Sequence, residues 1–141
     1  MGDRLCVVIP VRDQAEGIAT ILSRWDEELE RLGADYEIRP WNDGSADASL
    51  AVMRSFAATH PRVAVRTKDA SGHGATILSG YREAARDGFD WVFQLDADDR
   101  MAPGRFDELW SRRDDYDLLV GTRDKRRQSL PGKFVSAVSR A

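Results

Sequence analysis

The sequence predicts a three-layer α/β/α fold with a mostly parallel sheet. Short apolar runs alternate with amphipathic helical stretches along the chain, and nearly every glycine-rich or acidic motif directly follows an apolar run. Such alternation is typical of a parallel sheet with helices on both faces and right-handed crossovers. Ligands bind such sheets at the carboxyl ends of the strands, so we expect these motifs to gather at one edge.

The first half of the chain contains two predicted strand–helix pairs. The β-branched run 5–10 is typical of a strand buried on both faces. Apolar residues at helical spacing follow over 18–32, and Gly33 ends that helix. A second strand is expected over 36–41, and a second helix between residues 47 and 60.

The second half repeats the alternation with shorter elements. Strands are expected over 63–66, 91–95 and 118–121. Between them lie an apolar helical face over 77–85 and a short helix over 103–113, whose proline falls in the first turn, where its missing N–H costs little. The sequence therefore predicts five strands in one domain.

The end of the chain differs in composition. We expect residues 1–122 to form the α/β domain and residues 123–141 to be a basic tail. Phe134, Val135 and Val138 are at helical spacing within this tail, which indicates a helix there.

Composition excludes several classes of protein. The chain has 141 residues, 42% hydrophobic and 32% charged, which fits one folded domain rather than a disordered or membrane-spanning chain. The net charge of −3 argues against nucleic acid as a partner. The apolar start ends at Pro10, too early for a secretory signal, so a cytoplasmic location is expected. Cys6 is the only cysteine and is expected to be a buried strand residue.

The strongest chemical signal is the acidic pair that follows the fourth predicted strand. Asp96 and Asp98 flank one residue and would point to the same side if strand geometry continued. Carboxylate oxygens suit a hard divalent cation such as Mg²⁺ or Mn²⁺, which would still have open positions for two phosphates. The alternative is an acidic surface turn that caps the next helix.

Three other polar motifs also follow strands. Asn42 and Asp43 could contact a base or ribose, or could form only a turn with a helix cap. Pro10 to Gln14 is either the floor of a nucleotide pocket or an ordinary loop. Gly72, His73 and Gly74 open a helix where a phosphate could approach, and His73 either contacts the ligand or lies in solvent.

These motifs together resemble a known family. The order is Ile9-Pro10-Val11, Asn42 to Asp47, Gly72 to Ala75, Asp96-Ala97-Asp98 and Gly121-Thr122-Arg123. It is similar to family-2 glycosyltransferases of the Rossmann-like GT-A fold, and in particular to the dolichyl- and polyprenyl-phosphate sugar synthases. No single motif is specific, but the order and spacing of the five are.

The resemblance implies a role for each matched residue. It implies a metal site at Asp96 and Asp98, and an acceptor-phosphate contact at Arg123. The donor nucleotide would be bound by residues from four of the motifs: Pro10, Val11, Arg12, Gln14, Asn42, Asp43, Gly72, Asp96 and Ala97. A catalytic base is not identified, and an acceptor that is already an anionic phosphate would not need one.

The chain departs from the family at some positions. Arg12 stands where an aromatic residue is common, His73 where a basic residue is common, and Arg100 where some lipid-phosphate members have a metal-binding Gln. Family members usually continue well beyond this length, so we expect a fragment that contains the donor-binding half. The resemblance implies that residues 1–122 form a nucleotide-sugar-binding domain and that the basic tail, residues 123–141, begins an acceptor-binding region.

The sequence thus predicts an inverting glycosyltransferase, or its donor-binding fragment. It would transfer a sugar from a UDP- or GDP-linked donor to an acceptor such as a polyprenyl phosphate at the cytoplasmic face of a membrane. Two alternatives stay open: a non-catalytic nucleotide-binding domain, and a D-x-D phosphatase of the haloacid-dehalogenase type. The phosphatase is disfavoured because its aspartates would follow the first strand rather than the fourth.

Overall fold

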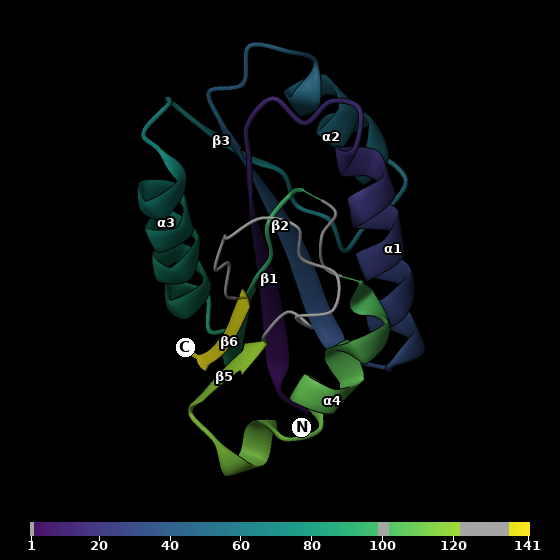
Figure 1. The fold of residues 1–141 in the computed structure, drawn as a ribbon, viewed down its shortest axis with the longest axis vertical. Coiled ribbons are helices and arrows are strands. Elements are labelled where there is room, and N and C mark those ends of the chain that lie inside the picture. Colours follow the sequence, from purple (N-terminus) through teal and green to yellow (C-terminus); the bar gives the residue numbers. More distant parts are fainter. Residues whose placement is uncertain (1, 99–101, 122–135) are drawn as a thin grey trace, which may run out of the picture.

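The computed structural model describes residues 2–98, 102–121 and 136–141, which form a sheet with helices on both faces (Figure 1). In chain order the elements are β1 (Arg4–Val11), α1 (Ile18–Arg31), β2 (Asp35–Asp43), α2 (Ser49–Ala57), β3 (Arg66–Lys68), α3 (His73–Arg86), β4 (Trp91–Gln94), the 3-10 helix η1 (Pro103–Arg105), α4 (Phe106–Trp110), the 3-10 helix η2 (Arg113–Asp115), β5 (Leu118–Gly121) and β6 (Ser136–Arg140). The predicted α/β fold is therefore confirmed.

The sheet has six strands in the order β3-β2-β1-β4-β6-β5. β1 pairs in parallel with β2 and β4, and β2 pairs in parallel with β3. Val7 in β1 lies opposite Ile38 on one side and Phe93 on the other. The carboxyl ends of β1, β2 and β4 therefore meet at one edge, as the fold class predicts.

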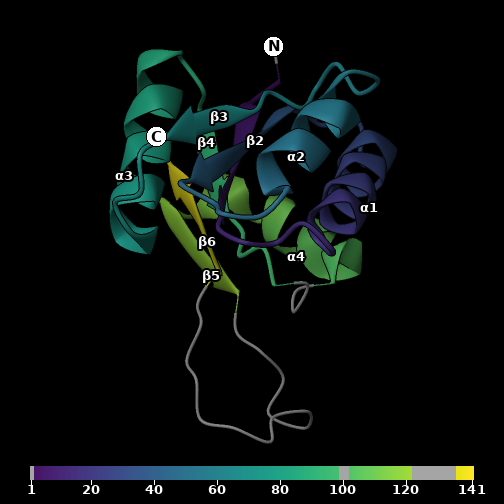
Figure 2. The same cartoon turned by 90° about the horizontal axis from the view of Figure 1, so that it is seen from above.

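The two faces of the sheet are covered by different helices. Figure 2 shows α3 on one side of the sheet and α1, α2 and α4 on the other. Alternate residues of β1 serve the two faces, since Val7 belongs to the larger core under α1 and Val8 to the smaller core under α3. Cys6 is in the smaller core with no exposed surface, and burial raises the pKa of its thiol to about 12. The expectation of a buried strand cysteine is confirmed.

An aromatic cluster joins α1 to the sheet and to α4. The ring of Trp25 lies 5.1 Å from that of Phe93 and 5.5 Å from that of Phe106, in tilted and edge-on contacts. Such pairs add about 0.5–1.5 kcal/mol each beyond the area they bury. The cluster therefore holds Phe106, the first residue of α4, against α1 and β4.

β3 and the helix expected after β4 differ from the sequence predictions. The third strand was expected over 63–66, but β3 is Arg66–Lys68, and Val63 makes only an isolated bridge to Ile38. The helix expected over 103–113 is divided into η1, α4 and η2.

Among the described residues, no helix is both long and apolar enough to cross a bilayer.

The helix expected from Phe134, Val135 and Val138 is wrong at Val138. This residue lies in β6, which runs antiparallel between β4 and β5, and Val138 is fully buried opposite Phe93. Phe134 and Val135 lie outside the described residues. The functional boundary at residue 122 stays a prediction, although β6 belongs to the same sheet as β1–β4.

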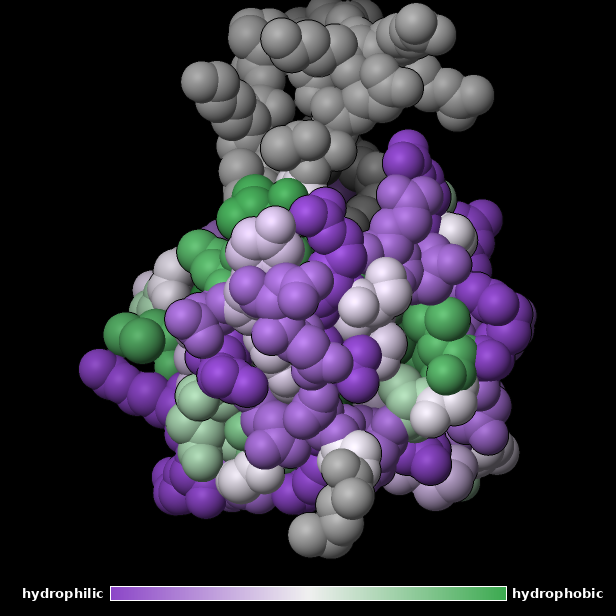
Figure 3. Space-filling view, turned by 90° about the horizontal axis from the view of Figure 1, so that it is seen from below, coloured by the Kyte–Doolittle hydropathy of each residue, from purple (hydrophilic) through white to green (hydrophobic). Residues whose placement is uncertain are grey.

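The described surface carries no broad apolar face in the view from below, where hydrophobic residues form separate small patches (Figure 3). Four large apolar residues are exposed in the described part of the chain: Leu78, Tyr116, Leu118 and Val120. Scattered exposed apolar residues are usual for a folded domain.

Candidate functional site

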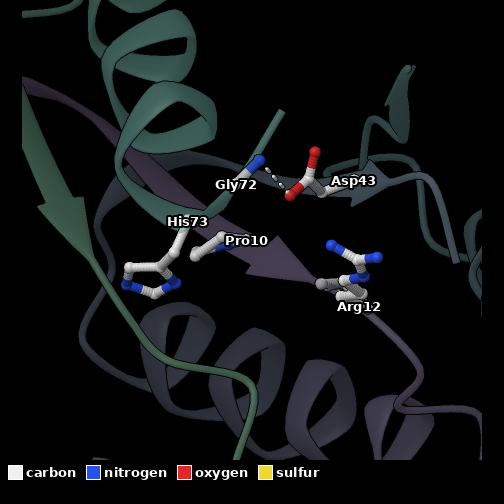
Figure 4. Close-up of a pocket in the computed structure, with 6 residues that line it drawn as sticks. Pro10, Arg12, Asp43, Gly72 and His73 are labelled. Carbon is white, nitrogen blue, oxygen red and sulfur yellow. Dashed lines mark hydrogen bonds between the residues drawn. The ribbon is translucent and has the colours of Figure 1, made fainter. Parts of the chain in front are cut away.

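Two adjoining hollows lie at the carboxyl ends of β1, β2 and β4. One, of about 270 Å³, is lined by Pro10, Val11, Arg12, Asp43, Gly72 and His73. The other, of about 210 Å³, is lined by Pro10, Arg12, Gln14, His73, Asp96, Ala97 and Asp98. They share Pro10, Arg12 and His73, and Figure 4 shows His73 and Arg12 on either side of Pro10. The site therefore joins the ends of three strands to the start of α3.

Asp43 anchors the glycine-rich loop to the end of β2. One carboxylate oxygen accepts a hydrogen bond from the N–H of Ser71 at 2.8 Å. The other accepts one from the N–H of Gly72 at 3.0 Å, which Figure 4 shows. Burial by itself would raise the pKa of Asp43, but these N–H groups and the charge of Lys68 outweigh it and hold the pKa below its ordinary value. Asp43 is therefore an anion that lines the first hollow and holds Gly72, another lining residue, in place.

Gly72 makes the turn from this loop into α3. Its φ of +96° lies in the region that only glycine adopts readily. Its carbonyl oxygen accepts hydrogen bonds from the N–H of Thr76 at 3.1 Å and from the Thr76 hydroxyl at 2.9 Å. The chain therefore enters the helix at once, and His73 is the first residue of α3.

The loop after β1 is held to the loop after β2 by Asp13. One oxygen of Asp13 accepts hydrogen bonds from the N–H groups of Ala46 at 2.7 Å and Asp47 at 3.3 Å, and the Asp13 N–H donates to the Ser45 hydroxyl. Asp13 has a φ of +52°, which is uncommon for a residue other than glycine. Arg12 and Gln14, the neighbours of Asp13 in sequence, both line the second hollow.

Asp96 is half-buried and lines the second hollow together with exposed Asp98. Oδ1 of Asp96 is buried and accepts no hydrogen bond from the described residues, while Nε2 of His73 lies 3.5 Å from it. The strand geometry assumed for the pair does not continue, because β4 ends at Gln94 and residues 97–98 form a turn. The turn nevertheless brings both carboxylates to the same hollow.

A divalent cation fits this end of the site. A buried carboxylate oxygen without a donor is costly unless a ligand satisfies it, and carboxylate oxygens suit Mg²⁺ and Mn²⁺. Within the described residues, no three His, Cys, Asp or Glu side chains are already gathered around one point. An ion here would therefore draw part of its coordination from a bound molecule or from water.

The structure brings most of the predicted site residues together. Nine of the predicted residues line the hollows: Pro10, Val11, Arg12, Gln14, Asp43, Gly72, Asp96, Ala97 and Asp98. Asn42 lines neither hollow; it is buried, its amide donates to the Thr67 hydroxyl, and its carbonyl oxygen accepts from the N–H of Ser45. Arg123 lies outside the described residues. His73, whose role the sequence left open, lines both hollows.

A mostly parallel sheet with acidic and glycine-rich loops at its carboxyl edge is typical of nucleotide-binding α/β proteins. The chain belongs to a particular family of them, glycosyl transferase family 2, whose model matches residues 6–136. This confirms the family that the motifs predicted and places the chain among glycosyltransferases, which leaves no support for the phosphatase alternative.

A curated relative is the undecaprenyl-phosphate 4-deoxy-4-formamido-L-arabinose transferase of Enterobacter sp. (strain 638). It is 34% identical over 128 residues, which are 89% of this chain and 38% of the relative. The chain thus spans about two fifths of the curated relatives it matches.

Solved structures show the same fold. TarS of S. aureus, residues 1–349, matches with a TM-score of 0.69 and 16% identity, over 92% of this chain and 38% of that one; it is also known in complex with UDP-GlcNAc. The mannosyltransferase PcManGT of Pyrobaculum calidifontis, in complex with GDP-Man and Mn²⁺, matches with a TM-score of 0.58 and 23% identity, over 70% of this chain and 28% of that one.

Proposed function

We propose that this chain is the donor-binding part of an inverting glycosyltransferase that moves a sugar from a nucleoside-diphosphate sugar to a polyprenyl phosphate. The observation that carries the proposal is the pair of adjoining hollows with Asp43 in one and Asp96 and Asp98 in the other. The first hollow suits the nucleoside, because Asp43 and neighbouring backbone can bind polar edges of a base or ribose. The second suits the diphosphate and its metal.

The diphosphate would lie between the acidic turn and the start of α3. Mg²⁺ or Mn²⁺ held by Asp96 and Asp98 would offset the charge that grows on the leaving diphosphate. Arg12, which lines both hollows, adds a guanidinium that can bind phosphate oxygens in a bidentate manner. The N-terminus of α3 presents further N–H groups to an anion.

The acceptor is proposed from the relatives and from the chemistry of the site. The curated relative is named for transfer to undecaprenyl phosphate. An acceptor of this kind is already an anion and can attack the anomeric carbon without a general base, which agrees with the lack of an identified base in the sequence. Such a lipid would place the working site at a membrane surface, on the cytoplasmic side.

Calorimetric titration with UDP- and GDP-sugars, with and without Mn²⁺, tests the donor site. We expect one nucleotide class to bind only with Mn²⁺, and Asp98→Asn to weaken that binding at least tenfold, since removing one charged ligand of a phosphate-bound cation costs about 1.4 kcal/mol or more. Asp35→Asn is the matched control, because Asp35 is exposed and begins β2 at the opposite edge of the sheet.

If neither UDP-sugars nor GDP-sugars bind under any metal condition, the proposal is contradicted. Equal binding with and without metal would leave a nucleotide-binding domain and remove the metal-assisted mechanism. Transfer to a polyprenyl phosphate acceptor is then measured separately, with radiolabelled donor and extraction of the lipid product.

A further inference from the structure

His73 occupies a distinctive position at the boundary of the two hollows. It lines both of them, it begins α3, and Nε2 of its ring lies 3.5 Å from Oδ1 of Asp96. The side chain is 55% exposed, so the ring is not held by packing in the interior. Nothing in the fold of the described residues requires an imidazole here.

The contact between His73 and Asp96 is not a hydrogen bond. A normal N–H···O bond spans about 2.7–3.2 Å, and Oδ1 of Asp96 is buried with no hydrogen-bond partner in the described part of the chain. Two atoms that each lie about 2.1 Å from one cation are about 3.0–3.4 Å apart at octahedral to tetrahedral angles. The observed 3.5 Å is close to that range, so the pair is spaced as two ligands of one ion would be.

We infer that His73 is a nitrogen ligand to the divalent cation of this site, beside Asp96. The inference rests on the proposed donor site and adds a residue that the acidic motif does not contain. Asp98 lines the same hollow, and the donor diphosphate would supply further oxygens. His73 lies at the start of α3, so a bound ion would tie the glycine-rich loop to the end of β4.

An imidazole ligand changes which ion the site prefers. Oxygen ligands suit both Mg²⁺ and Mn²⁺, but a nitrogen ligand is accepted more readily by a transition ion such as Mn²⁺ than by the harder, more strongly hydrated Mg²⁺. The inference therefore predicts that His73→Gln weakens Mn²⁺ binding at least about tenfold, the loss typical even for residues that only support a ligand. Mg²⁺ binding should fall by less, so the preference for Mn²⁺ over Mg²⁺ narrows.

The chain has only two histidines, which allows a direct test. Protein labelled with ¹⁵N-histidine is loaded with Mn²⁺ and nucleoside diphosphate and measured by pulsed electron–nuclear double resonance. We expect a ¹⁵N coupling to Mn²⁺ in the wild type and in His60→Gln, and none in His73→Gln. His60 is the matched control, because its Nδ1 lies 2.8 Å from the Phe56 carbonyl oxygen and its ring stacks on Phe56, outside both hollows.

The outcomes separate this inference from the proposed function. If Mn²⁺ and nucleotide bind to the wild type but no ¹⁵N coupling is detected, the assignment of His73 as a ligand is overturned and the proposed donor site is retained. A coupling that His73→Gln retains would overturn it as well. If neither Mn²⁺ nor nucleotide binds, the donor site and the His73 ligand fall together.

Discussion

Asp43 carries a stability prediction at the scale of the residue. Its carboxylate accepts the N–H groups of Ser71 and Gly72, and charge-assisted hydrogen bonds are each worth about 1.5–3 kcal/mol. Asp43→Asn should therefore lower the free energy of unfolding at neutral pH by about 2 kcal/mol. Chemical denaturation at pH 7 measures this, with Asp35→Asn as an exposed control that should change by no more than about 0.5 kcal/mol.

The pH dependence of the Asp43 contribution has a definite sign. The folded-state pKa of Asp43 lies below its ordinary value, so the carboxylate stabilises the fold fully above the ordinary pKa of about 3.9 and loses this effect as the pH falls through the lower folded value. The difference between wild type and Asp43→Asn should shrink only in this acidic window. A difference that stays constant from pH 7 into that window would contradict the assignment of the charge.

Individual residues show what the sequence could and could not predict at the site. Asp43 and Asp96 follow apolar runs, and the rule that strand ends share an edge was enough to place both in adjoining hollows. The sequence could not separate Asn42 from Asp43. Asn42 hydrogen-bonds to Thr67, 25 residues away, and Asp43 to Ser71, 28 residues away. Partners this distant in sequence decide that Asp43, and not Asn42, lines a hollow.

At the scale of the element, the turn after β2 depends on a glycine. Gly44 has a φ of +65°, and a Cβ there would lie 2.7 Å from the Cβ of Ala70 and 2.9 Å from its backbone nitrogen. The positive φ alone costs a residue with a side chain about 1 kcal/mol or more. Gly44→Ala should therefore destabilise the protein by at least about 2 kcal/mol, since the backbone of Ala70 must also move.

Thermal unfolding checks the Gly44 prediction against Gly104→Ala. Gly104 is in η1, has no positive φ, and has no atom within 4 Å of a built Cβ. We expect the control to change stability by no more than about 0.5 kcal/mol. If the two variants unfold at the same temperature, close approach of Ala70 does not constrain this turn.

Helices and strands with a strong periodic pattern of apolar residues were predictable from the sequence. Elements whose position depends on pairing with distant strands were not. The face of α1 repeats apolar residues that are buried in the structure, and the prediction and the helix agree to within one residue. β3 has no apolar alternation, since Arg66, Thr67 and Lys68 are all polar. Its place at the edge follows from pairing with β2, which lies far from it in sequence, so the prediction shifted to the apolar Val63.

At the scale of the whole molecule, β6 joins the end of the described chain to the centre of the sheet. It lies between β4 and β5 and is antiparallel to both, so it separates β5 from the parallel strands. The sequence did not predict this, because pairing with β4 spans more than forty residues of chain. Ser136 to Arg140 contains a single large apolar residue, Val138, so the sequence shows no apolar alternation that would mark a strand.

Val138 therefore tests whether β6 is an integral part of the fold. It is fully buried opposite Phe93, and its removal should cost the transfer free energy of two methyl groups plus a cavity, about 2 kcal/mol for Val138→Ala. Val120→Ala in β5 is the matched control, since Val120 is 42% exposed and its truncation should cost no more than about 0.5 kcal/mol. Denaturant midpoints of the two variants make the comparison. Equal midpoints would mean that β6 is not packed in the core, and the sheet would then end at β4.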